Sequence, residues 1–193
     1  MKDIGCAILA GGRSSRFGQD KATIRIDGKT LVGRVYDAAS LVFTDVVVVS
    51  SRHRELKDVP APILRDALPC PGAMTGIITA LLHSRTEYTF VVACDMPLVS
   101  ADVIAYMAGE LSEEDIVIPR TRWGYEPLHA IYSRACLAPL LALVRKGRFK
   151  ITDVLPFVSV KELREEERFI RNGRLIFTNV NTLNDLELMQ GTR

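Results

Sequence analysis

Strand-length apolar runs alternate along this chain with segments of helical period, and this alternation constrains the fold more than any other feature. The runs Ile4–Ala10, Asp45–Ser51 and Tyr88–Cys94 are largely continuous in apolar residues, which is typical of parallel strands that are covered on both faces. Between these runs, residues 30–43 and 72–84 carry apolar side chains at helical spacing. The resulting βαβαβα order predicts a three-layer α/β/α sandwich around a mostly parallel sheet, with right-handed crossovers.

The second half of the chain continues the pattern less regularly. Asp115–Pro119, Leu128–Ser133 and Leu175–Asn181 have the composition of further strands. Ser100 is placed to cap a helix that runs through Leu111. The charged run Lys161–Arg168 is most simply a solvated helix face. No repeat or low-complexity linker interrupts the 193 residues, so we expect one domain over residues 1–193.

Composition excludes several classes of function. The net charge of +2 is too small to indicate a nucleic-acid-binding protein. No apolar stretch approaches the roughly 18 residues that a membrane span needs, so we expect no membrane association. The four cysteines show no C-x-x-C spacing, which argues against a zinc site and favours small core residues. Together these features predict a reduced, cytoplasmic protein.

Polar and glycine residues follow the first three predicted strands. Gly11-Gly12 comes after the first strand, Ser51-Arg52-His53 after the second and Asp95 after the third. Ligands of open α/β sheets bind at the carboxyl ends of the strands. The sequence therefore predicts one site at that edge of the sheet.

The loop after the first strand has the chemistry of a phosphate site. Glycines let backbone N–H groups approach phosphate oxygens, and Arg13, Arg16 and Lys21 can neutralise a polyphosphate. Neither the Walker spacing nor the dinucleotide fingerprint G-x-G-x-x-G is present. The alternative is a plain glycine-rich turn with surface charges, and the clustering of cations favours the phosphate site.

Asp95 is the candidate metal ligand. It directly follows a buried run, in the sequence VVACDMP, and Mg²⁺ usually takes one or two protein carboxylates together with phosphate oxygens and water. The alternative is a cap for the helix that begins near Ser100. Because Asp95 lies too far upstream of that helix for a regular cap, we favour the metal.

Several motifs in order resemble the molybdenum cofactor guanylyltransferases. The stretch LAGGRSSRFGQDKA, residues 9–22, is similar to the family signature L-A-G-G-x-S-x-R-M-G-x-D-K. Asp66 before a Pro-Gly turn, CDMPLV at residues 94–99, EPLHAIY at 126–132 and NVNTLNDL at 179–186 agree as well. The resemblance implies a Rossmann-like fold of the nucleotide-diphospho-sugar transferase type. It also implies that GMP is transferred from GTP to the phosphate of molybdenum-molybdopterin, with release of pyrophosphate.

The resemblance also implies roles for individual residues. Backbone contacts to the guanine nucleotide would come from Leu9, Ala10, Gly11 and Gly12. Lys21 would hold the phosphates, Asp66 would lie on the base or ribose side, and Asp95 would bind Mg²⁺. Arg16 would stabilise charge at the transferring phosphate and contact the acceptor, which Asn179 and Asn181 would also bind. The catalytic residues are then Arg16, Lys21 and Asp95, while His53, His83 and His129 receive no catalytic role. Proteins that deliver molybdopterin, and proteins associated with molybdoenzymes, are the partners that the resemblance suggests.

Departures from the family pattern leave alternatives open. Phe17 stands in place of Met, and residues 72–76 read GAMTG in place of G-P-L-x-G, which makes the choice of base less certain. A cytidylyltransferase acting on the same acceptor, a sugar-phosphate nucleotidyltransferase, and a non-catalytic nucleotide-binding or cofactor-binding adaptor remain alternatives. Arg16, Lys21 and Asp95 are all present, which counts against the adaptor.

Two further segments have two interpretations each. Residues 123–125, Trp-Gly-Tyr, form either an aromatic lid over a pterin or a loop anchored by partly buried aromatic rings. Lys146, Arg148 and Lys150 either receive an acceptor phosphate or are cations at the C-terminus of a helix.

Overall fold

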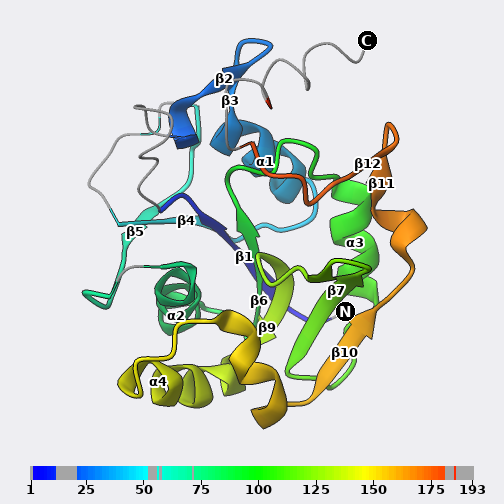
Figure 1. The fold of residues 1–193 in the computed structure, drawn as a ribbon. Helices are drawn as coiled ribbons and strands as arrows, with labels where there is room; N and C mark the ends of the chain where they lie inside the picture. The colour runs from blue at the N-terminus through cyan, green and yellow to red at the C-terminus, as the bar shows by residue number, and fades with distance from the viewer. Residues whose placement is uncertain are drawn as a thin grey trace.

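A mixed β-sheet forms the centre of the molecule (Figure 1). The computed structural model describes residues 2–11, 21–51, 56, 58–70, 72–180 and 185. In this part of the chain the sheet has the strand order β10-β7-β9-β6-β1-β4-β5, and β8 pairs with β7. Its strands are β1 (Ile4–Leu9), β4 (Val46–Ser50), β5 (Ile63–Arg65), β6 (Tyr88–Ala93), β7 (Ile116–Thr121), β8 (Gly124–Tyr125), β9 (His129–Ser133) and β10 (Val160–Leu163).

Helices cover both faces of this sheet. They are α1 (Leu31–Ser40), α2 (Ala73–His83), α3 (Ala101–Gly109) and α4 (Leu137–Arg145), with short 3-10 helices η1 (Lys21–Thr23), η2 (Arg134–Cys136), η3 (Ile151–Phe157) and η4 (Glu166–Phe169). α1 and α3 contribute to the core on one face, whereas α2 and α4 contribute to the core on the other. The predicted three-layer α/β/α sandwich is therefore confirmed.

The sheet is parallel around β1 and mixed beyond β6. β1 pairs in parallel with β4 and β6, and β4 pairs in parallel with β5. β9 runs antiparallel to both β6 and β7. As a consequence β6 and β7 point the same way, and the carboxyl ends of β1, β4, β5, β6 and β7 all lie at one edge of the sheet.

Two short hairpins lie outside the main sheet. β2 (Arg25–Ile26) pairs with β3 (Lys29–Thr30), and β11 (Ile170–Arg171) pairs with β12 (Arg174–Leu175). Each turn consists of two residues with positive φ. They are Asp27 (49°) and Gly28 (80°) in the first hairpin, and Asn172 (50°) and Gly173 (72°) in the second. Such turns match the twist of a two-stranded ribbon.

Two element predictions were wrong. Lys161–Arg168 is not a helix face, because Val160–Leu163 is the edge strand β10, which pairs in parallel with β7. Charged side chains suit such an exposed edge. The predicted strand Leu175–Asn181 is also wrong over its described residues, 175–180: only Leu175 belongs to β12, and the chain then turns so that Ile176 and Phe177 enter the core.

The cysteines behave as core residues. Cys6, Cys94 and Cys136 are buried and Cys70 is partly buried, and all four are free thiols. Burial raises the pKa of Cys136 to about 12 and that of Cys6 further still. No helix within the described residues is long and apolar enough to cross a membrane.

Candidate nucleotide-binding site

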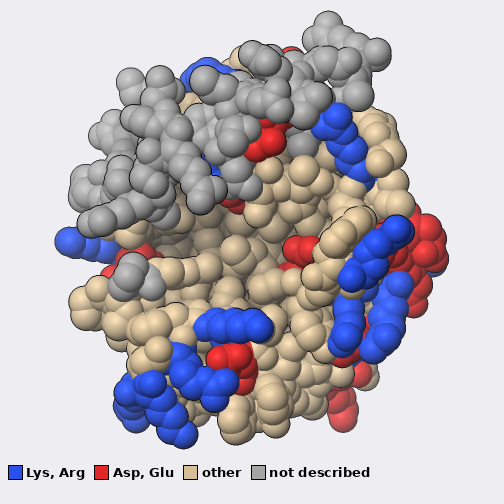
Figure 2. Space-filling view, in the orientation of Figure 1, with Lys and Arg blue, Asp and Glu red and all other residues tan. Residues whose placement is uncertain are grey.

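A cavity of about 1020 Å³ opens at the carboxyl ends of β1, β4, β5 and β6. Figure 2 shows the hollow near the middle of the face in view. The strand ends, the segment before α2 and the start of η1 all contribute to its lining, which includes Leu9, Ala10, Gly11, Lys21, Ser51, Asp66, Gly72, Gly76 and Asp95. The cavity has the size of a site for a small-molecule ligand.

Backbone hydrogen bonds fix the first strand end in this cavity. The amide of Ala10 donates to the carbonyl of Val49 (2.8 Å), and the amide of Cys94 donates to the carbonyl of Leu9 (3.1 Å). A side chain at Gly11 would contact the Ser51 backbone nitrogen at 3.5 Å and Asp66 Oδ2 at 3.9 Å. Glycine at this position therefore leaves the backbone open to a ligand between the ends of three strands.

Asp66 presents a partly buried carboxyl to the cavity. Its amide donates to the carbonyl of Ser50 (3.2 Å), and burial raises the pKa of its side chain above the ordinary value. Two buried threonines of α2 hold the loop that follows it. Thr79 Oγ1 accepts from the amide of Ala67 (2.9 Å), and Thr75 Oγ1 donates to the carbonyl of Cys70 (3.0 Å). Sequence reasoning missed both threonines, because they lie within a helix that reads as apolar.

Lys21 and Asp95 form an ion pair in the cavity. Lys21 Nζ lies 3.1 Å from Asp95 Oδ2, and the side chains are 24% and 18% exposed. Lys21 begins η1 whereas Asp95 follows β6, so the fold joins residues that are 74 positions apart. A partly shielded pair of this kind provides one cationic and one anionic group to a charged ligand.

The segment that ends at Val180 also contacts Asp95. The amide of Val180 donates to the Asp95 carbonyl at 2.9 Å. Asn179 precedes Val180, and its Oδ1 atom is buried with no hydrogen-bond donor among the described residues. A buried amide oxygen without a donor is costly unless a ligand satisfies it, so Asn179 is available for one.

Four of the ligand-binding residues proposed from the sequence lie outside the described residues: Gly12, Arg13, Arg16 and Asn181. The others, namely Leu9, Ala10, Gly11, Lys21, Asp66, Asp95 and Asn179, lie at the cavity or on the segment that contacts Asp95. Their individual roles stay predictions.

Trp123 and Tyr125, the aromatic residues after β7, differ in their exposure and in their contacts. Trp123 is 71% exposed, and the guanidinium of Arg122 lies over its ring. Tyr125 donates a hydrogen bond to Glu162 and accepts one from Arg120. The Tyr125 side chain is therefore anchored by hydrogen bonds, whereas the Trp123 ring is exposed and stacks against Arg122. Arg148 forms an ion pair with Asp153 (2.8 Å). The proposed phosphate-binding role of Lys146, Arg148 and Lys150 stays a prediction.

The described histidines have structural environments. His83 ends α2, and its Nδ1 lies 2.9 Å from the carbonyl oxygen of Thr79. His129 is fully buried, with its ring between those of Phe90 and Phe177. Burial lowers the pKa of His129 to about 3. His53 lies outside the described residues.

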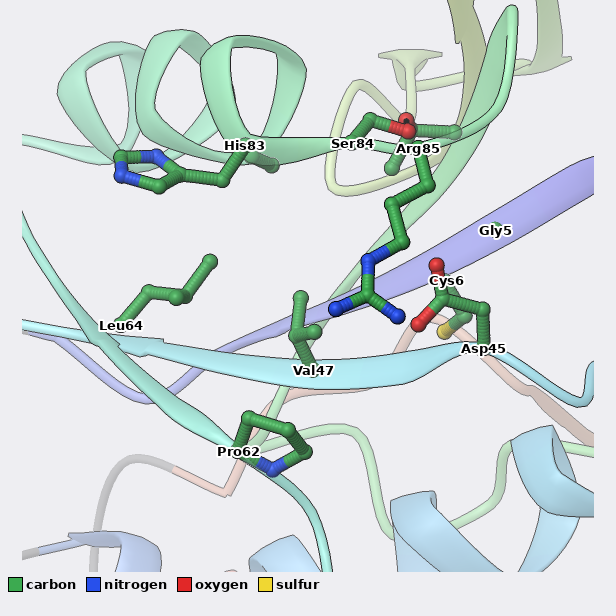
Figure 3. A pocket seen from close by; sticks show the side chains of 11 residues that line it. Gly5, Cys6, Asp45, Val47, Pro62, Leu64, His83, Ser84 and Arg85 are labelled. Carbon is green, nitrogen blue, oxygen red and sulfur yellow. Dashed lines mark hydrogen bonds between the residues drawn. The ribbon is translucent and has the colours of Figure 1, made fainter.

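A smaller hollow of about 250 Å³ lies at the opposite edge of the sheet (Figure 3). It is bordered by Asp45, just before β4, and by His83, Ser84 and Arg85 at the end of α2. Because it faces the amino ends of the parallel strands, it is separate from the large cavity.

The sequence and the fold are both similar to those of known proteins. The MobA-like NTP transferase domain matches residues 6–159. The chain belongs to this family. A member from Desulfosudis oleivorans, named molybdenum cofactor guanylyltransferase, is 34% identical over 93% of this chain and 91% of its own length.

Solved structures agree with the family. The crystal structure of molybdopterin-guanine dinucleotide biosynthesis protein A from Archaeoglobus fulgidus matches with a TM-score of 0.82 and 27% identity, over 96% of each chain. An Aquifex aeolicus protein matches with a TM-score of 0.78 and 30% identity, over 94% of each chain. The large cavity is thus the candidate site of a MobA-like NTP transferase.

Proposed function

We propose that this chain transfers GMP from GTP to the phosphate of molybdenum-molybdopterin, which yields molybdopterin guanine dinucleotide and pyrophosphate. The observation that carries the proposal is the Lys21–Asp95 pair in the cavity beside the open backbone of Gly11, in a member of the MobA-like family. Relatives named molybdenum cofactor guanylyltransferase support the choice of GTP and of the acceptor.

The reaction needs alignment and charge neutralisation more than covalent help. An oxygen of the acceptor phosphate attacks the α-phosphorus of GTP, and the bond from that phosphorus to the β-phosphate bridging oxygen breaks. The attacking oxygen belongs to an anionic phosphate, so no general base is assigned. Lys21 supplies positive charge to the phosphates, and Arg16 adds to it at the transferring phosphate in this proposal. The backbone of Leu9, Ala10 and Gly11, with Gly12, contacts the nucleotide.

Mg²⁺ is the proposed cofactor. The donor chemistry fits a hard cation, because the Asp95 carboxylate lines the cavity in which the phosphates are proposed to bind. Asp95 would hold the ion. Bound there, Mg²⁺ would neutralise phosphate charge. Asn179 and Asn181 remain the proposed contacts to the acceptor.

Base selection is proposed for Asp66, whose carboxylate lies on the β5 side of the cavity. A carboxylate accepts the paired N–H donors of guanine, which cytosine lacks. A cytidylyltransferase with the same acceptor is the alternative. A cytoplasmic location, and docking with proteins that deliver molybdopterin or belong to molybdoenzyme assembly, are part of the same proposal.

Thermal unfolding with each nucleotide tests the function first. The protein is heated with GTP, CTP, ATP or UTP, with and without Mg²⁺. A ligand at about 100 times its dissociation constant adds roughly 2.7 kcal/mol, which raises the midpoint by roughly 5–10 °C for a domain of this size. We expect GTP to give the largest shift and Mg²⁺ to increase it. A shift with CTP alone would overturn the proposed base, and no shift with any nucleotide would favour the adaptor.

Asp95→Asn tests the proposed cation site. The substitution keeps the shape of the side chain but removes its charge, so the variant should unfold at nearly the wild-type temperature. Dinucleotide formation should fall by roughly a hundredfold or more, and Mn²⁺ binding in the presence of GTP, followed by electron paramagnetic resonance, should weaken. Near-normal turnover together with normal Mn²⁺ binding would show that Asp95 holds no cation.

A further inference from the structure

Two threonines of α2 hold both ends of a loop in the wall of the large cavity. Thr79 Oγ1 accepts a hydrogen bond from the amide of Ala67 at 2.9 Å. Thr75 Oγ1 donates one to the carbonyl of Cys70 at 3.0 Å. Thr79 Oγ1 also donates to the carbonyl of Thr75 at 2.8 Å, so its proton is used within the helix and a lone pair is left for the Ala67 amide. The two hydroxyl groups therefore join residues 67–70 to the same helix.

The hydroxyl groups of Thr75 and Thr79 contribute to this loop rather than to the helix. Both side chains are fully buried in α2, whose other buried residues are apolar or glycine. A hydroxyl group in such surroundings destabilises the fold unless it is hydrogen-bonded, and threonine is a weaker helix former than leucine or methionine. Ala67 and Pro69 are exposed, so apolar packing gives the loop little support. The two side-chain bonds are therefore what ties the loop to the helix.

Asp66 is the cavity residue whose position depends on these bonds. Its own amide donates to the carbonyl of Ser50, the last residue of β4, at 3.2 Å. The next amide, that of Ala67, donates to Thr79 on α2. Two consecutive peptide groups are thus bound to two different elements. Because peptide groups are planar, fixing both of them sets the direction in which the Asp66 side chain leaves the backbone.

α2 is also fixed against the strand end at which backbone contacts to the nucleotide are proposed. A side chain at Gly76 would lie 3.1 Å from Leu9 Cδ1, which is closer than ordinary contact, so the helix packs directly on Leu9 at the end of β1. Leu9, Gly76 and Asp66 all line the cavity. The helix therefore sets the distance between the end of β1 and the loop that follows Asp66.

We propose that Thr75 and Thr79 are positioning residues for base selection: they hold the loop after Asp66 so that its carboxylate meets the two N–H donors of guanine. The inference rests on the proposed function, in which Asp66 selects the base. Lys21, which is proposed to hold the phosphates, belongs to η1 and pairs with Asp95, so a shift of the loop leaves it in place. The hydroxyl groups therefore determine which base is preferred rather than how tightly the triphosphate is held.

Thr79→Val tests the inference with little change of shape, because it removes the hydroxyl group and leaves the Ala67 amide without its acceptor. Dissociation constants are measured with Mg²⁺ for GTP and for the triphosphate of unsubstituted purine riboside, which has neither N–H donor of guanine. We expect wild type to bind GTP roughly tenfold more tightly, or more, because hydrogen bonds to a carboxylate are lost with the purine. In Thr79→Val this preference should fall to about twofold through weaker GTP binding, with the affinity for the purine triphosphate unchanged.

Thr89→Val is the matched control. Thr89 is buried, and its hydroxyl group donates to Ser84 Oγ at 3.0 Å beside the smaller hollow at the opposite edge of the sheet. It should lower the unfolding temperature about as much as Thr79→Val and leave both affinities at the wild-type value. Thr79→Ser keeps the hydroxyl group and should keep the preference for GTP, whereas Thr75→Val, which frees the Cys70 carbonyl, should lower it.

A double variant shows whether Thr79 acts through Asp66. In an Asp66→Ala background, Thr79→Val should cause no further loss of the preference for GTP. A full additional loss there would overturn the inference, because Thr79 would then act on another contact. Equal losses of affinity for both triphosphates in Thr79→Val, or an unchanged preference in both Thr79→Val and Thr75→Val, would overturn it as well.

The two proposals fail in different ways. If the wild-type protein forms no dinucleotide from GTP and molybdenum-molybdopterin, the proposed function is wrong. If the wild type forms the dinucleotide and Thr79→Val keeps the wild-type ratio of kcat/KM for GTP over the purine triphosphate, only the role of the threonines is wrong.

Discussion

At the scale of single residues, the most unusual environment outside the cavity is that of His129. The ring is fully buried between Phe90 and Phe177, and neither ring nitrogen has a hydrogen-bond partner in the described part of the chain. Such an imidazole is held neutral, and its pKa of about 3 lies far below the ordinary 6.5. Below pH 6.5 the unfolded chain therefore binds a proton that the folded chain cannot bind.

This difference predicts a pH dependence of stability. The His129 contribution to the free energy of unfolding is fully present above pH 6.5 and falls by about 1.4 kcal/mol per pH unit as the pH is lowered toward 3. His129→Phe removes it. In urea unfolding at pH 7.5 and pH 5.0, wild type should therefore lose about 2 kcal/mol more than the variant between the two pH values. Equal losses for the two proteins would show that the buried ring is protonated in the folded state or is hydrated.

At the scale of elements, the strands of the first half were predictable because both their faces are buried. β1, β4 and β6 read as apolar runs, and the helices between them show a clear apolar face. β10 was not predictable in this way. It is an edge strand with charged side chains, and its identity depends on pairing with β7, more than 40 positions earlier in the sequence.

The residues of the candidate site were predictable where they directly follow parallel strands. Gly11, Asp66 and Asp95 follow strands, and parallel strands bring their carboxyl ends together whatever the loops between them contain. Thr75 and Thr79 were missed because their hydroxyl groups bond to a loop rather than to solvent.

At the scale of the whole molecule, a net charge of +2 hides an uneven distribution. Lys and Arg side chains gather at the lower left in Figure 2, over the region of α4. We call Arg145, Lys146, Arg148 and Lys150 the α4 basic patch, and all four are exposed. α4 follows β9, which ends at the amino edge, so the helix runs back and its C-terminus lies toward the same edge as the large cavity. Both proposed substrates are strongly anionic.

The α4 basic patch should therefore raise the rate at which anionic substrates reach the cavity. We expect Lys146→Gln/Lys150→Gln to lower the association rate constant of a fluorescent GTP analogue by roughly two- to fivefold at 50 mM KCl, with the dissociation rate constant unchanged, because the patch acts at a distance. At 0.5 M KCl screening should abolish the difference. Lys2→Gln/Arg85→Gln, which removes the same charge at the amino edge, is the control in stopped-flow measurements. If both double variants slow association equally, net charge alone is responsible; if the α4 variant instead raises the dissociation rate constant, these lysines contact the nucleotide directly.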